Sequence, residues 1–92
     1  TTLDVPAPAG NPSPGNGATG VSSASPTLSW GAVATATGYD VWFNGVQVST
    51  NQPGTSFLPG ALAANTMYTW RVDPKNAAGT TTGVTWSFTT AP

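Results

Sequence analysis

The chain has 92 residues, the size of one small domain, and contains neither cysteine nor histidine. Disulfide and zinc staples are therefore excluded, so stability has to come from burying its four tryptophans, two tyrosines and three phenylalanines with the aliphatic residues. Only 5% of the residues are charged and the net charge is −1, which excludes nucleic acid and a membrane surface as electrostatic partners.

Residues 1–18 are rich in proline and glycine. We interpret this stretch as a semi-extended linker that precedes a domain of residues 19–92. Its end, residues 11–18, is also compatible with a first edge strand, because proline is tolerated at sheet edges.

Alternation of apolar and polar residues begins in segment 26–30 and returns in segment 37–43. The second segment runs directly into Asn44-Gly45, and Val46-Gln47-Val48 follows. An Asn-Gly pair between two alternating runs predicts a two-residue β-hairpin, because both central positions need a positive φ.

The second half of the chain predicts three more strands, at residues 55–58, 67–72 and 81–89, with a turn at 74–79. No segment shows the 3.6-residue apolar period of a helix. About seven short strands closed by Gly, Pro or Asn predict an all-β sandwich of two antiparallel sheets.

The same alternation divides side chains between core and surface. Trp42 is the one aromatic residue expected outside, on a face that it shares with Asp40. The residues expected in the core are Leu28, Trp30, Tyr39, Val41, Phe43, Phe57, Leu62, Tyr68, Trp70, Val72, Val84, Trp86 and Phe88.

Three motifs resemble the fibronectin type III domain, over about residues 12–90. Pro26-Thr27-Leu28-Ser29-Trp30 resembles its second strand with a core tryptophan. Leu62, six residues before Tyr68, resembles its tyrosine corner, in which the hydroxyl bonds to nearby backbone. The ending GVTWSFTT, residues 83–90, is similar to the last strand of type III modules in bacterial secreted proteins. The resemblance implies an immunoglobulin-like sandwich.

The chain departs from that family at two places. Ala64 stands where the corner usually has proline, and Asp73-Pro74 falls within the sixth strand. We expect the strand to end early or to bulge at this proline. The tripeptide Arg-Gly-Asp is absent, so integrin binding is not implied.

No set of residues suited to an enzyme reaction is found in the sequence. Neither histidine nor glutamate is present to act as a base beside Ser or Thr. Asp4, Asp40 and Asp73 are too scattered for a calcium site, and only the last two could approach each other. We therefore predict no catalytic residue, no metal site and no cofactor.

The candidate ligand face consists of Trp42, Asp40, Arg71 and Thr69, because the resembled fold places the third and sixth strands side by side. Two registers are possible, with Asp40 opposite Arg71 or opposite Asp73. Like charges directly opposed are disfavoured, so we expect the Asp40–Arg71 pairing, with Arg71 able to lie across Trp42. An open indole on this neutral face suits a pyranose, whereas one covered by Arg71 and Thr69 needs no ligand.

The leading functional hypothesis is a non-catalytic spacer or interaction module, a monomeric unit between neighbouring domains of a secreted or cell-surface protein. We expect carbohydrate-active or adhesive domains beside it. One alternative is weak polysaccharide binding through Trp42, and another is adhesion or self-association through a sheet edge. Thr-Thr pairs at residues 1–2 and 89–90 suggest tandem repeats.

Overall fold

The computed structural model describes residues 4–24 and 26–92. Within these ranges there is no helix, which confirms the all-β prediction. The described residues therefore contain no helix long and apolar enough to cross a membrane. The strands are β1 (Ala18–Val21), β2 (Leu28–Ser29), β3 (Gly38–Phe43), β4 (Val46–Gln52), β5 (Ser56–Phe57), β6 (Met67–Asn76), β7 (Gly79–Thr80) and β8 (Trp86–Thr90).

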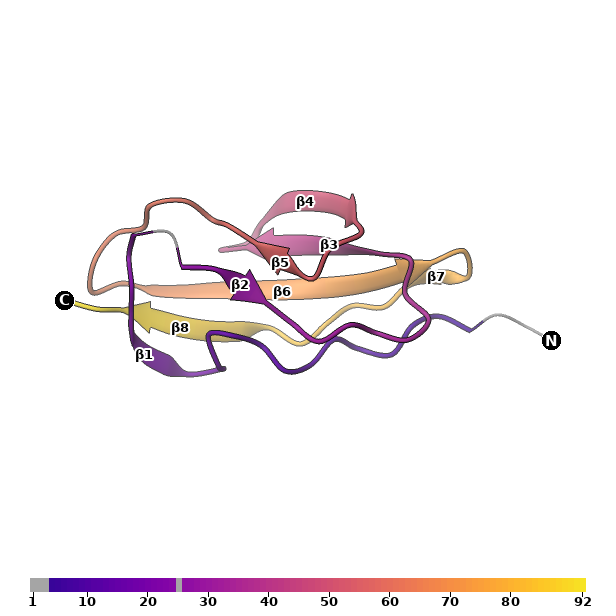
Figure 1. Ribbon diagram of the computed structural model, residues 1–92, viewed down its shortest axis with the longest axis horizontal. Coiled ribbons are helices and arrows are strands. Elements are labelled where there is room, and N and C mark those ends of the chain that lie inside the picture. The colour runs from indigo at the N-terminus through magenta and orange to yellow at the C-terminus, as the bar shows by residue number, and fades with distance from the viewer. Residues whose placement is uncertain (1–3, 25) are drawn as a thin grey trace.

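The strands form two sheets, with β2 and β5 crossing in front of the larger one in Figure 1. The larger sheet has the order β1-β8-β6-β3-β4, and β7 pairs with the end of β6. Neighbouring strands are antiparallel, except that β1 and β8 are parallel. The molecule measures 52 × 19 × 18 Å, and its strands follow the long axis.

The predicted hairpin joins β3 to β4. Phe43 pairs with Val46, while Asn44 and Gly45 take φ values of 53° and 84°. Two consecutive positive φ angles are what a type I′ turn requires, and this turn matches the right-handed twist of the flanking strands. The hairpin prediction is confirmed.

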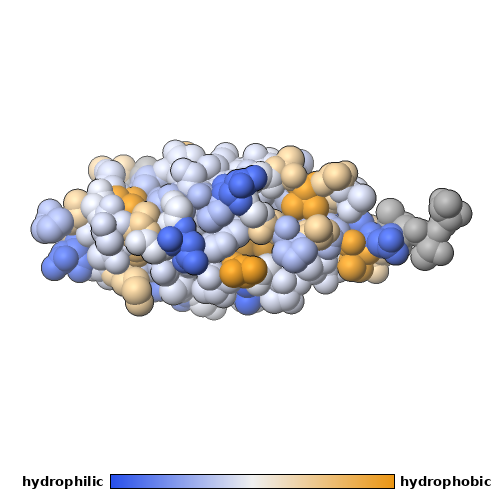
Figure 2. Space-filling model, turned by 90° about the horizontal axis from the view of Figure 1, so that it is seen from below, coloured by the Kyte–Doolittle hydropathy of each residue, from blue (hydrophilic) through white to orange (hydrophobic). Residues whose placement is uncertain are grey.

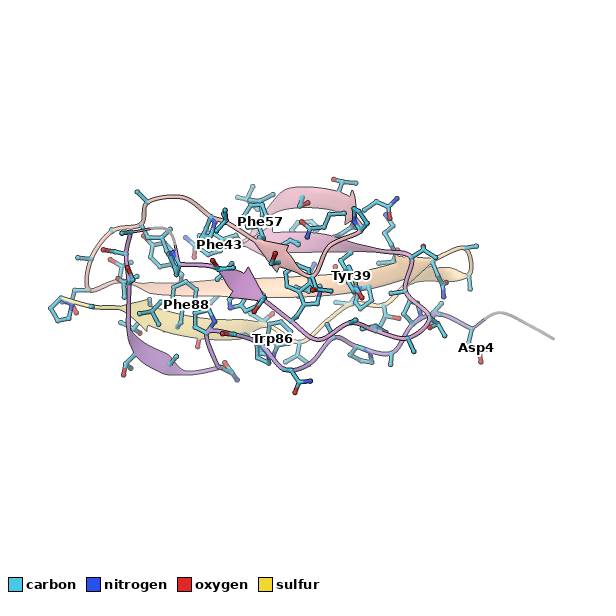
Figure 3. The ribbon with its side chains drawn as sticks, in the orientation of Figure 1. Asp4, Tyr39, Phe43, Phe57, Trp86 and Phe88 are labelled. Atoms are coloured by element: carbon cyan, nitrogen blue, oxygen red, sulfur yellow. The ribbon has the colours of Figure 1, made fainter. Side chains whose placement is uncertain are left out.

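Aromatic rings fill the space between the sheets. Trp70 is 1% exposed and its ring packs edge-on against Trp86, with centroids 4.7 Å apart. The ring of Phe43 stacks on Tyr68 at 5.3 Å. Figure 3 shows Tyr39, Phe43, Trp86 and Phe88 in this interior. Among the residues expected in the core, Phe43, Phe57, Leu62 and Tyr68 are partly buried and pack against the fully buried ones, which are Leu28, Trp30, Tyr39, Val41, Trp70, Val72, Trp86 and Phe88.

Val84 was expected in the core, but it is 55% exposed. The last strand begins at Trp86, and segment 81–85 follows the edge of β6 through single contacts instead of a ladder. The N–H of Gly83 donates to the Asp73 carboxylate, and a Cβ at Gly83 would clash with the Val72 carbonyl oxygen. Only glycine fits this approach, and the strand alternation used for Val84 does not hold in this segment.

The sixth strand neither ends early nor bulges at Pro74. β6 runs on to Asn76, with Pro74 opposite Tyr39. The carbonyl of Pro74 accepts a bond from the Thr81 N–H, so this residue's backbone polar groups face segment 81–85 and not β3. Proline has no N–H to donate, but at residue 74 this position faces the side of β6 where the ladder with β8 has already ended. The strand therefore loses no sheet hydrogen bond there.

The segment predicted as a linker packs against the sandwich over its described part. Pro6 and Ala9 are buried, and Ser13 exchanges two backbone bonds of 2.8 and 2.9 Å with Ser29 of β2. The packed unit thus begins before residue 19, because apolar burial and backbone pairing hold this stretch in place. The Thr1-Thr2 pair behind the tandem-repeat expectation lies outside the described residues.

Candidate functional site

The outer face of β3 and β6 carries four of the five charged side chains. Asp40 lies opposite Asp73, and Trp42 lies opposite Arg71. The predicted Asp40–Arg71 pairing is therefore wrong, and the register that sets two carboxylates opposite each other is the one adopted.

Each carboxylate has its own cation, which offsets the repulsion. Arg71 donates to Asp73 through Nε (2.9 Å to Oδ1) and Nη2 (3.1 Å to Oδ2). The Nζ of Lys75 lies 3.4 Å from both oxygens of Asp40. Backbone N–H groups add one further bond to each, from Gly83 to Asp73 (2.8 Å) and from Asn51 to Asp40 (2.7 Å). The face is consequently close to neutral.

Arg71 also lies across Trp42. Its Cζ is 4.8 Å from the ring centroid, within the range of a cation–π contact. The two bonds to Asp73 hold the guanidinium there, so one face of the indole is covered and the ring is half-buried.

Beside this pair is a hollow of about 270 Å³, lined by Trp42, Gly45, Thr69, Trp70, Arg71 and Thr85. The hairpin turn is held at its rim because the Asn44 N–H donates to the Thr69 carbonyl at 2.7 Å. Two threonines, an indole and a charge-paired guanidinium suit a small, neutral, hydroxylated ligand better than an ion.

Three of the four predicted face residues line the hollow: Trp42, Thr69 and Arg71. Asp40 does not, because it is engaged with Lys75 and Asn51. Sequence reasoning missed Thr85 and Gly45. Strand alternation would have placed Thr85 on the outer face, because its neighbour Trp86 points inward. Gly45 lines the hollow with its backbone, which a pattern of side chains cannot predict.

In the part of the chain that the structure describes, no group of three or more Asp, Glu, His or Cys side chains is placed so that it could hold a metal ion. The hollow contains no carboxylate among its lining residues.

The predicted tyrosine corner is formed: the Ala63 N–H donates to the Tyr68 hydroxyl at 2.9 Å. The solved structure described as "Structure of FN3tt mut" matches with a TM-score of 0.67 and 15% identity, covering 96% of this chain and 97% of that one. The chain has the fibronectin type III fold. No protein-family model matches it.

Two curated relatives resemble this type III domain in sequence. Chitinase A1 of Niallia circulans is 41% identical over 70 residues, which is 72% of this chain and 10% of that protein. An alpha-amylase of Niallia circulans is 38% identical over 69 residues, which is 72% of this chain and 5% of that protein. The chain thus spans a tenth or less of the length of these relatives.

Proposed function

We propose that this type III domain is a non-catalytic spacer and interaction module in an extracellular multidomain protein that acts on carbohydrates. The observation that carries the proposal is the position of its ends: Asp4 lies at one end of the 52 Å long axis and the C-terminal residue at the other. A chain that enters and leaves at opposite ends separates whatever is attached to it by the full length of the sandwich.

Both ends are fixed to the sandwich. At one end the Asn76 side chain donates to the Asp4 carbonyl at 2.8 Å, and the Thr81 hydroxyl donates to the Pro6 carbonyl. At the other end the Ala91 N–H donates to the Val21 carbonyl at 2.8 Å. These contacts favour a stiff unit over a flexible tether, and the similarity to a chitinase and an alpha-amylase favours carbohydrate-active neighbours.

The surface supports a module that stays monomeric. The face seen in Figure 2 is mostly pale, and its hydrophobic residues lie in separate spots. The exposed edge strand β4 pairs irregularly with β3, with register shifts on both sides of Val41. Bulged edges oppose pairing with a second sheet, so we propose neighbouring domains, and not further copies docked edge to edge, as the partners.

Paired spin labels test the spacer, because the chain has no cysteine of its own. Ala7→Cys and Pro92→Cys place one label near each end, and double electron–electron resonance measures their separation. A flexible Gly/Ser chain of this length has a mean end-to-end distance of about 50–55 Å, close to the 52 Å length of the domain. The mean distance therefore does not separate a rigid spacer from a flexible chain, but the width of the distance distribution does. We expect one narrow distance that broadens in urea; a broad distribution in buffer would exclude a rigid spacer.

The hollow favours a second candidate function, weak binding of a neutral polysaccharide. A sugar there would meet the exposed part of Trp42 and the hydroxyls of Thr69 and Thr85. Affinity electrophoresis of the wild type, Trp42→Ala and the control Val84→Ala against soluble polysaccharides tests this. Retardation by one polymer that only Trp42→Ala abolishes, at a temperature at which circular dichroism shows all three proteins folded, would establish binding; equal mobility of all three in every gel would exclude it.

A further inference from the structure

We infer that Asn44 is a site of spontaneous covalent modification, at which the side-chain amide is converted to a carboxylate without an enzyme. The inference does not depend on the spacer or the polysaccharide function proposed above. It starts from a repeated dipeptide, because Asn-Gly occurs twice in the sequence, at Asn16-Gly17 and at Asn44-Gly45. In the folded domain the two copies have different hydrogen bonds, and this difference carries the inference.

The reaction joins the asparagine side chain to the backbone nitrogen of the next residue. That nitrogen gives its proton to hydroxide and bonds to Cγ, while the bond from Cγ to the amide nitrogen breaks and ammonia leaves with a proton from water. Water then opens the cyclic imide. Breaking the new bond to Cγ leaves aspartate, and breaking the original peptide bond leaves isoaspartate, in which the main chain runs through the side chain. Glycine favours the attack because it has no Cβ to hinder it.

At Asn16-Gly17 both reacting groups are held by Ser87 of β8. The Gly17 N–H donates to the Ser87 carbonyl at 2.8 Å, so the attacking nitrogen is engaged. Oδ1 of Asn16 accepts from the Ser87 N–H at 3.0 Å, so the amide under attack is engaged as well. Both hydrogen bonds have to break before this nitrogen can bond to Cγ.

The Asn44-Gly45 copy forms the turn between β3 and the edge strand β4 (Figure 1). Within residues 4–24 and 26–92, nothing is hydrogen-bonded to the Asn44 side chain, to the Asn44 carbonyl or to the Gly45 N–H. The peptide unit between the two residues can therefore rotate without breaking a hydrogen bond. That rotation converts a type I′ turn into type II′ and turns the Gly45 nitrogen towards the Asn44 side chain.

Solvent exposure does not separate the two sites, because Asn16 and Asn44 are both exposed. Hydrogen bonding does. Two bonds of about 1 kcal/mol each, broken at one site and absent from the other, correspond to a roughly thirtyfold difference in rate.

The modification changes the rim of the hollow, which Gly45 lines. Aspartate keeps the turn, because Asp-Gly also suits type I′, and it adds one negative charge to a domain whose net charge is −1. Isoaspartate makes the main chain longer by one carbon between Phe43 and Val46, which pair across a two-residue turn. We therefore expect the isoaspartate form to unfold at lower urea concentration than the variant Asn44→Asp.

Incubation at mildly alkaline pH tests the inference, because hydroxide starts the reaction. Samples taken over time in buffer and in guanidinium chloride are digested, and mass spectrometry of the fragments gives the extent of conversion at each asparagine. In denaturant the two sites should react at similar rates, because each is Asn-Gly followed by an aliphatic residue. In buffer we expect Asn44 to react roughly thirtyfold faster than Asn16.

Asn44→Gly is the matched control, because Gly-Gly also suits a type I′ turn. It should abolish the main acidic species that ion exchange separates from aged wild-type protein, and leave the slow conversion at Asn16 unchanged. Circular dichroism shows beforehand that the variant is folded. Equal rates at the two sites in buffer, or an acidic species that persists in Asn44→Gly, would overturn the inference.

Discussion

The two faces of the large sheet are organised by different interactions. On the inner face, side chains of β3, β6 and β8 meet β2 and β5 in a buried aromatic core, with Trp70 and Phe88 both 1% exposed. On the outer face of β3 and β6, two ion pairs and one cation–π contact join Asp40, Trp42, Arg71, Asp73 and Lys75.

The difference between the faces explains the register of β3 on β6. The adopted alignment places Val41 opposite Val72 and Phe43 opposite Trp70 on the inner face. A buried aromatic contributes about 4–6 kcal/mol before entropy is subtracted, whereas exposed ion pairs contribute about 0–1 kcal/mol. Core packing therefore sets the register, and the outer charges find partners within it.

The largest effect should come from the inner face. Trp70→Ala removes a ring that contacts both Trp30 and Trp86, and we expect a loss of about 3–5 kcal/mol in the free energy of unfolding. Trp42→Ala removes the same side chain from the outer face of the neighbouring strand, where it is half-buried, and should cost less than half as much. Urea unfolding measures both, and equal losses would break the distinction between the faces.

On the outer face, the two opposed carboxylates should differ. Asp73 is 5% exposed, and Asp73→Ala leaves the Gly83 N–H and the Arg71 guanidinium without their acceptor, which should cost about 1–3 kcal/mol. Asp40→Ala should cost less, about 0–1 kcal/mol, because its contact with Lys75 is long, at 3.4 Å, and water reaches the exposed bond from Asn51.

The double variant shows whether the two carboxylates act on each other. Because each is balanced by its own cation, the two losses should add to within about 0.5 kcal/mol. A larger coupling would mean that repulsion between Asp40 and Asp73 strains the register, and that the outer face does influence strand alignment.

The fold was predictable where local pattern and burial agree. The all-β class, the Asn44-Gly45 hairpin and the Tyr68 corner all follow from residues close together in the chain. What could not be predicted depends on which segments become neighbours. β6 can continue through Pro74 only because the neighbouring strand β8 no longer pairs with it at that point. Pro6 is buried only because strands distant in the sequence together form the surface that covers it.

The candidate site follows the same division. Trp42, Thr69 and Arg71 could be assigned to one face from alternation and the resembled strand order, and they line one hollow. The ion-pair partner of each charged side chain could not be predicted, because the register of β3 on β6 follows from the packing of the inner face. Arg71 binds Asp73 on its own strand, a pairing that no cross-strand rule considers.

The tyrosine corner lies where the core meets the surface, and an intermediate effect is expected there. Tyr68→Phe keeps the stacked ring on Phe43 but removes the hydroxyl that accepts from the Ala63 N–H. We expect a loss of about 0.5–1.5 kcal/mol in urea unfolding, the usual net value of one hydrogen bond. An unchanged midpoint would show that water replaces the hydroxyl without cost.

The smallest effect is expected at Val84. At this residue the position expected from strand alternation, in the core, differs most from the exposed position in the structure. If Val84 faced the core, Val84→Ala would cost about 1.5 kcal/mol or more for the apolar groups lost. At 55% exposure it should change the free energy of unfolding by less than about 0.5 kcal/mol. Val72→Ala, in a fully buried position of β6, is the matched control and should show the full core penalty. Comparable losses at both positions would mean that segment 81–85 packs inward as a regular strand, and that the Gly83–Asp73 contact does not hold it along the edge of β6.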